Sequence, residues 1–540
     1  DNNASITSHG GIFLDELTGP MEVDTLWSID NVSLRTVDGS IRDARNNGLG
    51  DNLANVLGQT VDLDANGAGA SIGSSGNDLE IDSSRGSPAL TLDAAGDDVA
   101  MEATDNIYVT ETDGLLRLVL AHTYTGDIRI TVHETAETDE HLHLVDSGSA
   151  RFAESTFRNA QPDAPRLIPH GQIFAENGKV TLLVGDNVSL DSNSEILARE
   201  SIDIFGDVSA TNGTIAALAN LDLGFGTIML LRGRIIANAV VVAGSQSGGT
   251  PVGTATRRTT APAFLTQIYG NTDVDTIQFG DGSGAAGGTS QGDDGYIFLG
   301  SKTRAYGSQN IPVYDAATGK FVSAGDDGED RFIVYYLQDT ASQTGPNMVT
   351  SAEHTLTLDG QADTDTYLVY TLGSQGNARN YVINVLDTGR EDDGVDELSI
   401  FGFDSAKNGA SFQTDDIFLL RAAAYLPNET ADRPGYVALL HGTLGPYHDV
   451  VQGNEDSNEV QRINYDSGLN GRLTVEGRGG NDAFFTDDTT VITTLDGGAG
   501  DDTFQIGQIF GAQRDTADGG LLPQDVFPNL VATKIGRAHV

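Results

Sequence analysis

The sequence of 540 residues contains no cysteine, one tryptophan and only 7% aromatic residues. Without cysteine the protein forms no disulfide bonds and performs no thiol catalysis. It also lacks any run of about 18 apolar residues, so we expect no membrane-spanning helix. The hydrophobic content of 38% is low, but it suffices for a thin, repetitive core.

Basic residues are scarce as well, with 30 Lys and Arg against 78 Asp and Glu and a formal net charge of −48. Such a surface repels nucleic acid and anionic bilayers, so we expect neither as a partner. Calcium ions are compatible with it, and their binding would reduce the self-repulsion of the chain. The acidic, cysteine-free composition suits a protein exported to the cell surface or the medium.

Both ends of the chain favour a fragment of a larger reading frame. The sequence starts at Asp1 without a signal peptide. Residues 534–540 resemble the translation of a sequencing-library adapter, and we exclude them from fold reasoning.

Short apolar segments with period-two alternation dominate the chain, and glycine, asparagine and aspartate separate them. Such segments suit stacked parallel rungs, because each rung contacts only the rungs above and below it. We therefore expect an all-β fold with parallel β-helix or β-solenoid regions. Residues 416–425 are the best short-helix candidate, although they could start as a strand. Typical predicted strands are 32–36, 79–82, 180–184, 228–231 and 366–370.

Linker-like stretches rich in glycine, serine or proline suggest five regions. The predicted regions are a β-solenoid-like region at 1–160, a β-solenoid at 171–245, a β region with a glycine-rich loop at 263–345, a β region with degenerate acidic loops at 350–470, and calcium-binding loops at 471–515.

Two glycine–aspartate loops lie near the C-terminus, and a strand-like segment follows each of them. The second loop, GGAGDDTF from Gly497 to Phe504, fits the calcium-binding pattern G-G-x-G-x-D-x-hydrophobic. The first, GRGGNDAF from Gly477 to Phe484, has Arg478 at the second glycine position. Calcium takes about six to eight oxygen ligands, backbone carbonyls among them, and glycine permits the tight turns that gather such carbonyls. The predicted calcium-site residues are Gly477, Gly479, Asn481, Asp482, Gly497, Gly498, Gly500, Asp501 and Asp502.

The spacing of the two loops differs from that of tandem nonapeptide repeats, because Asp482 and Asp502 lie 20 residues apart. A step of this length suits one turn of a wider parallel β-helix. It predicts that Asp482 stacks on Asp502 and that Phe484 stacks on Phe504. The alternative is a pair of glycine–aspartate turns that bind nothing tightly.

A shorter kernel, G/D-x-D-x-hydrophobic, recurs at 328–332, 363–367 and 394–398. The intervals between these copies are irregular. We interpret each copy as a structural turn.

Residues 477–504 resemble hemolysin-type (RTX) calcium-binding proteins, through one full motif and one imperfect copy. This resemblance implies type I secretion, an unfolded state when calcium is scarce, and ordering by external calcium. The strand-rich remainder looks like the β-helical shafts of large secreted adhesins of the filamentous-hemagglutinin sort. Together the resemblances imply a structural or adhesive role, with cell-surface or polysaccharide ligands.

Three aspartic-protease-like triplets begin at Asp146, Asp387 and Asp466. In such enzymes two aspartates share a proton and activate water. A chain rich in Asp, Ser, Thr and Gly contains such triplets by chance as turns, and we favour turns.

A carbohydrate-active β-helix enzyme, a polysaccharide lyase or hydrolase, is the alternative function. The acid pairs Asp363 with Asp365 and Asp392 with Asp393 serve equally well as turn acids, so we assign no catalytic residue. His141 and His143 would provide two ligands of a weak zinc site if both lie on one strand face.

Overall fold

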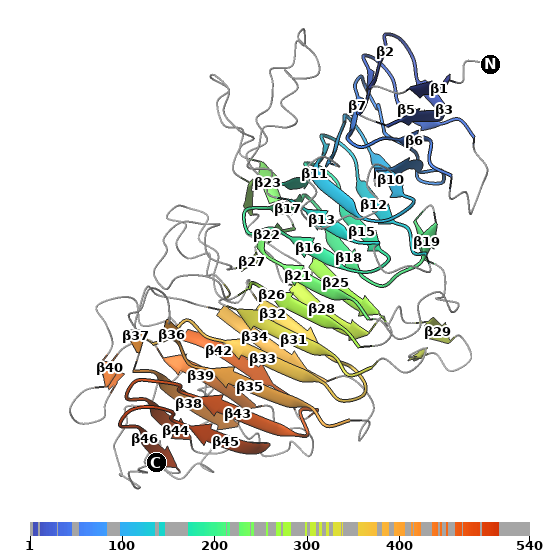
Figure 1. The fold of residues 1–540 in the computed structure, drawn as a ribbon. Coiled ribbons are helices and arrows are strands. Elements are labelled where there is room, and N and C mark those ends of the chain that lie inside the picture. The colour runs from blue at the N-terminus through green and yellow to red at the C-terminus, as the bar shows by residue number, and fades with distance from the viewer. Residues whose placement is uncertain are drawn as a thin grey trace. The chain divides into compact units, whose positions relative to one another are not determined.

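The structure is a computed structural model in which the described residues form strands and turns, without a helix (Figure 1). It describes residues 4–8, 11–29, 31–45, 53–83, 98–135, 140–145, 171–211, 213–215, 226–237, 239–241, 255–257, 266–271, 274–281, 297–299, 303–308, 313–315, 320–322, 328–335, 337, 355–374, 381–387, 394–405, 412–413, 415–422, 435–440, 443–444, 450–451, 460–466, 468–486 and 489–506.

The chain forms two compact units. Unit 1 comprises Asp1–Asp273 and Ile297–Ser301, and unit 2 comprises Val274–Tyr296 and Lys302–Val540. The five regions expected from composition stay predictions.

Unit 1 contains two long sheets in which neighbouring strands run parallel. Sheet A1 contains β1 (Ala4–Ser8), β3 (Met21–Ser28), β5 (Ile41–Asp43), β6 (Val56–Leu57), β8 (Leu79–Asp82), β10 (Ile107–Glu111), β12 (Ile128–Val132), β15 (Val180–Val184), β18 (Ile202–Phe205) and β25 (Thr266–Asn271). Sheet B1 contains β2 (Ile12–Glu16), β4 (Val32–Thr36), β7 (Val61–Ala65), β9 (Asp98–Ala103), β11 (Leu116–Thr123), β13 (Leu142–Leu144), β14 (Gln172–Ala175), β16 (Val188–Leu190), β17 (Glu195–Ala198), β21 (Ile228–Leu231), β22 (Gly233–Ile236) and β27 (Ile297–Leu299).

Unit 2 repeats this plan with one interruption. Sheet B2 contains β26 (Thr276–Phe279), β31 (Arg331–Tyr335), β33 (Thr366–Tyr370), β35 (Glu397–Phe401), β43 (Arg472–Glu476) and β45 (Ile492–Asp496), all parallel. In spatial order, sheet A2 contains β28 (Thr303–Ser308), β32 (Thr355–Asp359), β34 (Tyr381–Leu386), β42 (Val460–Tyr465), β39 (Gly435–Leu440), β38 (Ile417–Ala422), β44 (Ala483–Thr486) and β46 (Thr503–Ile506). Only β39 runs antiparallel to both of its neighbours.

Five antiparallel pairs complete the described strands. They are β19 (Ala210–Thr211) with β20 (Thr214–Ile215), β23 (Ala239–Val241) with β24 (Ala255–Arg257), β29 (Val313–Asp315) with β30 (Lys320–Val322), β36 (Asp404–Ser405) with β37 (Phe412–Gln413), and β40 (Thr443–Leu444) with β41 (Val450–Val451).

Within each unit the chain alternates between the two sheets, and we call one passage through both sheets a rung. Several rungs are 20 residues long, because Ile12 pairs with Val32 and Arg472 pairs with Ile492. Alternate side chains point inward and are buried, as in β7, where Val61, Leu63 and Ala65 form the core. The prediction of an all-β fold with long parallel sheets is confirmed, and the arrangement is compatible with a β-solenoid.

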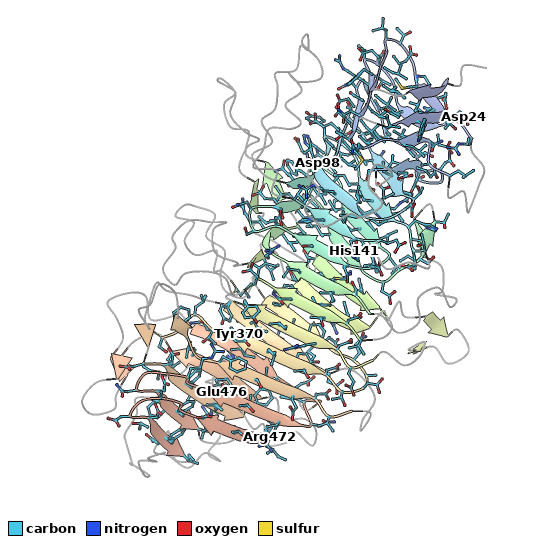
Figure 2. All side chains as sticks on the ribbon, in the orientation of Figure 1. Asp24, Asp98, His141, Tyr370, Arg472 and Glu476 are labelled. Atoms are coloured by element: carbon cyan, nitrogen blue, oxygen red, sulfur yellow. The ribbon has the colours of Figure 1, made fainter. Side chains whose placement is uncertain are left out.

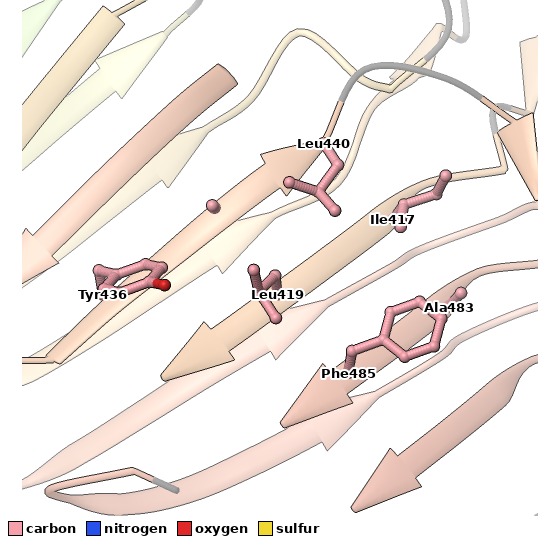
Figure 3. Packing of buried hydrophobic residues seen from close by; sticks show 7 residues of the cluster. Ile417, Leu419, Tyr436, Leu440, Ala483 and Phe485 are labelled. Carbon is pink, nitrogen blue, oxygen red and sulfur yellow. The ribbon is translucent and has the colours of Figure 1, made fainter. Parts of the chain in front are cut away.

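The helix considered for residues 416–425 is wrong where the structure describes it, because β38 occupies Ile417–Ala422. Phe418 and Leu420 are buried on one face of this strand. Ile417 and Leu419 are buried on the other face, in a cluster with Tyr436, Ala438, Leu440, Ala483 and Phe485 (Figure 3). A strand buried on both faces is apolar at successive positions, so its sequence lacks the alternation that marks a strand.

Candidate calcium-binding corner

The two predicted loops form equivalent corners of consecutive rungs in unit 2. In each, a glycine follows the strand of sheet B2 and an aspartate precedes the strand of sheet A2. The positive φ angles also recur at the same positions, with 73° at Arg478 and 79° at Gly498, then 127° at Gly480 and 140° at Gly500. The two loops therefore share one backbone conformation.

Backbone hydrogen bonds stack one corner on the other. The N–H of Ala499 donates to the carbonyl of Arg478 (2.8 Å), and the N–H of Gly480 donates to the carbonyl of Ala499 (2.9 Å). A Cβ at Gly498 would overlap the carbonyl oxygen of Arg478, so the second loop requires glycine there. The close approach of the two loops thus explains why glycine is needed at position 498.

The stacking predicted from the 20-residue step is confirmed. Ala483 pairs with Thr503 and Phe484 pairs with Phe504, so the preceding aspartates lie on adjacent rungs. The two phenylalanine rings stack with centroids 4.9 Å apart. Phe484 also stacks on Phe418 of the preceding rung, at 5.1 Å.

The aspartates form a ladder along the corner. The N–H of Asp416 donates to Oδ1 of Asp482 (2.7 Å), and the N–H of Asp482 donates to Oδ1 of Asp502 (2.9 Å). An outer ladder runs beside it, in which Asp415 Oδ1 accepts from the N–H of Asn481 (2.7 Å) and Asn481 Oδ1 accepts from the N–H of Asp501 (2.9 Å). Each carboxylate or amide oxygen thus holds a backbone donor of the neighbouring rung.

The second carboxylate oxygen of Asp482 is the unusual atom of the corner. Asp482 is 0% exposed, and its Oδ2 has no hydrogen-bond partner among the described residues. This oxygen fills the space that a Cβ would take at Gly477, and the carbonyl oxygen of Gly497 lies 2.9 Å from the same point. A carboxylate oxygen and a carbonyl oxygen therefore converge where glycine leaves room.

Burial raises the pKa of Asp482 from 3.8 to about 8. The hydrogen bond from the N–H of Asp416 opposes this shift, and the negative charges of Asp416, Asp502 and Asp415 add to it. A buried carboxylate without a partner is costly, so it takes up a proton or binds a cation.

Asp416, one rung earlier, shows how such a carboxylate is satisfied by the protein itself. Its Oδ1 accepts from the N–H of Ser374 (2.7 Å) and its Oδ2 accepts from the N–H of Phe403 (2.8 Å). Backbone donors therefore hold both of its oxygens, and the comparison makes Asp482 the better candidate for a cation. The oxygen donors that converge there, from the carboxylate of Asp482 and the carbonyl of Gly497, fit calcium, a hard cation.

A second aspartate ladder lies at the opposite corners of unit 2, where the chain enters sheet B2. The N–H of Asp275 donates to Oδ1 of Asp330 (2.8 Å), that of Asp330 to Asp365 (2.9 Å), and that of Asp365 to Asp396 (2.9 Å). Asn470 ends the series by accepting from the N–H of Asp396 (3.1 Å). The three degenerate kernels supply Asp330, Asp365 and Asp396 to this ladder.

Sequence reasoning missed Asp275 and Asp416 as ladder members. Both stand in the local pattern D-x-hydrophobic directly before a strand, which is the signal that could have found them.

Unit 1 holds a buried acidic group that the sequence did not reveal. Ligand atoms of Glu134, Glu140 and Asp186 lie within 4.8 Å of one another. Their contacts are internal, since the N–H of Glu140 donates to Oδ2 of Asp186 (2.9 Å) and the hydroxyl of Thr135 donates to Glu140. Asp186 follows Glu140 by 46 residues, so no short spacing pattern marks the three residues together.

The two histidines considered for zinc each contact a different carboxylate. Nδ1 of His141, labelled in Figure 2, lies 3.7 Å from Oδ2 of Asp186. Nε2 of His143 lies 3.1 Å from Oδ1 of Asp191. The structure therefore gives each imidazole its own acidic neighbour.

Two of the protease-like triplets lie on adjacent rungs, because β34 pairs with β42 just before Asp387 and Asp466. Burial raises the pKa of Asp466 to about 6, backbone hydrogen bonds from Gly468 and Asp387 oppose the shift, and the charge of Asp387 adds to it. Asp466 thus caps backbone donors as the ladder aspartates do. The triplet at Asp146 and the acids Asp392 and Asp393 lie outside the described residues.

Comparison with protein families, curated proteins and solved structures finds no match to this chain. Across the part of the chain that the structure describes, no helix has the length and apolar character needed to cross a membrane. The geometry of the corner is therefore the basis for a functional assignment.

Proposed function

We propose that this chain belongs to a large secreted or surface-attached bacterial protein in which calcium orders the corner at 477–504, and that its role is structural or adhesive. The observation that carries the proposal is Oδ2 of Asp482, which is buried without a hydrogen-bond partner beside the carbonyl of Gly497. The remaining oxygens come from the residues predicted for this site and from water. Calcium would keep the carboxylate of Asp482 ionised and would link its rung to the rung of Gly497. Without calcium, the carboxyl group between these rungs is either protonated or buried as an unpaired charge.

The long parallel sheets support a shaft-like role. Successive rungs are joined by regular backbone ladders, and each rung stabilises only its neighbours. The charge of −48 keeps such a shaft soluble, and bound calcium reduces its self-repulsion. Secretion and adhesion to cell-surface or polysaccharide ligands follow from the RTX-like and adhesin-like resemblances and belong to this proposal.

Calcium titration of the full chain tests the proposal. We expect saturable heat, a gain in β-sheet circular dichroism and a higher melting temperature. Calcium at about 100 times its Kd adds about 2.7 kcal/mol to the stability of the part that binds it. The double variant Asp482→Ala with Asp502→Ala should lose the response.

A matched control is Asp416→Asn, because backbone N–H groups already hold both oxygens of Asp416. This variant should keep its calcium heat even if its melting temperature falls. No heat from the wild-type chain up to about millimolar calcium, the weak end of extracellular sites, would refute the calcium site.

A carbohydrate-active enzyme is the second candidate, and the neighbouring carboxyls Asp387 and Asp466 favour it. A carboxyl with a pKa of about 6 is suited to general acid catalysis. Cleavage of acidic or neutral polysaccharides that disappears in Asp466→Asn would support this function. Cleavage that survives the substitution would remove these residues from consideration.

A further inference from the structure

His122 lies on sheet B1 of unit 1 between two carboxylates from different rungs. The strand register places it beside Glu102 of β9 on one side and beside Phe174 of β14 on the other. Its Nδ1 lies 3.3 Å from Oε1 of Glu102, and its Nε2 lies 3.0 Å from Oε1 of Glu176, which follows β14. Three successive rungs therefore meet at one imidazole.

The surroundings hold this ring in place. His122 is 1% exposed and stacks on Phe174 with centroids 5.3 Å apart, and the ring of Tyr124 lies 4.4 Å away. The ring cannot swing into water without breaking these contacts. The protonation state of His122 therefore decides whether each carboxylate faces an N–H donor or a nitrogen lone pair.

The geometry favours the doubly protonated ring. An ionised carboxylate only accepts hydrogen bonds, and a neutral imidazole carries a single N–H. With a neutral ring, one of the two contacts would set a nitrogen lone pair against a carboxylate oxygen. An imidazolium donates to both carboxylates, and such charge-assisted bonds are stronger than neutral ones.

The charged groups around the site favour the same state. Along sheet B1 the register continues from Glu102 to Asp64 and then to Arg35, which lies between Asp64 and Asp15. Glu102 and Asp64 are thus like charges on neighbouring strands. Glu102 has Asp64 on one neighbouring strand and His122 on the other. A positive charge at His122 therefore compensates Glu102 from the side opposite to Asp64.

Two further groups belong to this environment. Arg199 follows β17, and its N–H donates to Ala175, the residue before Glu176 (3.0 Å). The phenol ring of Tyr124 also faces the imidazole.

We propose that protonated His122 is a pH-sensitive staple that joins three successive rungs of sheet B1. Its stabilisation is fully present below about pH 6.5, the ordinary histidine value, and is lost when the imidazolium deprotonates. After deprotonation, one of the two carboxylates faces a ring nitrogen that has lost its proton and repels it. Unit 1 then loosens at β9, β11 and β14 without a change elsewhere.

Amide hydrogen exchange of peptides from β9, β11 and β14 tests the staple in the full chain. After correction for intrinsic exchange rates, wild-type protection should fall at least tenfold between about pH 6 and pH 8.5. His122→Gln should show low protection that does not change with pH. His133→Gln, at the half-buried histidine after β12, should keep the wild-type profile.

A wild-type protection that stays constant over this range would overturn the proposal, and so would a His122→Gln variant with the wild-type pH profile. If His122→Gln does not fold, hydrogen exchange at the ring C2 position of the wild type replaces it. The staple then requires His122 to titrate at higher pH than His133. Titration of the two rings in step would refute the staple.

Discussion

Replacing Asp482 with asparagine separates the charge of the buried carboxyl from its shape. Asparagine keeps an Oδ1 that accepts the N–H of Asp416, and it adds an amide donor beside the carbonyl of Gly497. The variant therefore retains the corner and removes the group that must be neutralised. We expect it to fold in the absence of calcium.

The expected effect on stability follows from the pKa of Asp482. Its value of about 8 lies roughly four units above the ordinary 3.8, and each unit corresponds to about 1.4 kcal/mol. Between about pH 4 and pH 8 the folded state binds one proton more than the unfolded state. The free energy of unfolding therefore falls as pH rises, by up to about 1.4 kcal/mol per pH unit and about 5 kcal/mol in total. Asp482→Asn should remove this dependence.

Chelator-treated wild type and variant would be unfolded with urea at about pH 5, 6.5 and 8. The free energy of unfolding of Asp482→Asn relative to that of the wild type should increase at each step up in pH. The variant should be the more stable protein at about pH 8. Calcium should reverse that order, because it stabilises only the ionised carboxylate. A stability difference that does not change with pH would refute the reasoning about the buried charge.

Two further predictions concern the backbone of the same corner. Gly500→Ala should lower the free energy of unfolding by more than about 2 kcal/mol, because φ is 140° and a Cβ would overlap a carbonyl of the preceding rung. The control Gly76→Ala places its Cβ in open space and should change the melting temperature little. Arg478→Gly removes a left-handed arginine, a gain of about 1 kcal/mol, but loses cation–π contacts with Tyr370 (5.0 Å) and Phe401 (4.8 Å) worth about 0.5–1 kcal/mol each. Urea unfolding should therefore show a net change within about 1 kcal/mol, and a loss above about 2 kcal/mol would contradict this balance.

Arg478 also shows what the sequence could not explain. It breaks the RTX-like motif at the second glycine, and no neighbour in sequence accounts for it. In the structure its guanidinium lies over two stacked rings on earlier rungs of sheet B2, one of them Tyr370, labelled in Figure 2. These cation–π contacts between rungs offset the strain of a left-handed arginine at position 478, where glycine would adopt the same φ without strain.

The parts of the fold that depend on constant spacing were predictable. The 20-residue step placed Phe484 on Phe504 because no insertion lies between them. The position of Asp416 was not predictable in this way, because 66 residues separate it from Asp482 and the antiparallel β39 lies within that interval. The insertion between β38 and β44 removes the constant spacing in sequence, although the two strands still pair in register.

The comparison of Asp416 with Asp482 indicates what distinguishes the two aspartates. Both aspartates follow a glycine corner, and both take part in the same ladder of backbone hydrogen bonds. The difference arises at the residue after the glycine. Phe403 directs its N–H to the carboxylate of Asp416, whereas Arg478 adopts a φ of 73° and the carboxylate of Asp482 receives no such donor.

The aspartate alone therefore does not define the calcium signature. Its glycines matter because left-handed residues turn backbone donors away from the carboxylate and leave carbonyl oxygens beside it. The kernels at 328–332, 363–367 and 394–398 keep the aspartate without the full run of glycines, and the Oδ1 atoms of Asp365 and Asp396 accept the same kind of inter-rung hydrogen bond. At Asp482, calcium would take the place of the hydrogen bond that the N–H of Phe403 gives to the carboxylate of Asp416.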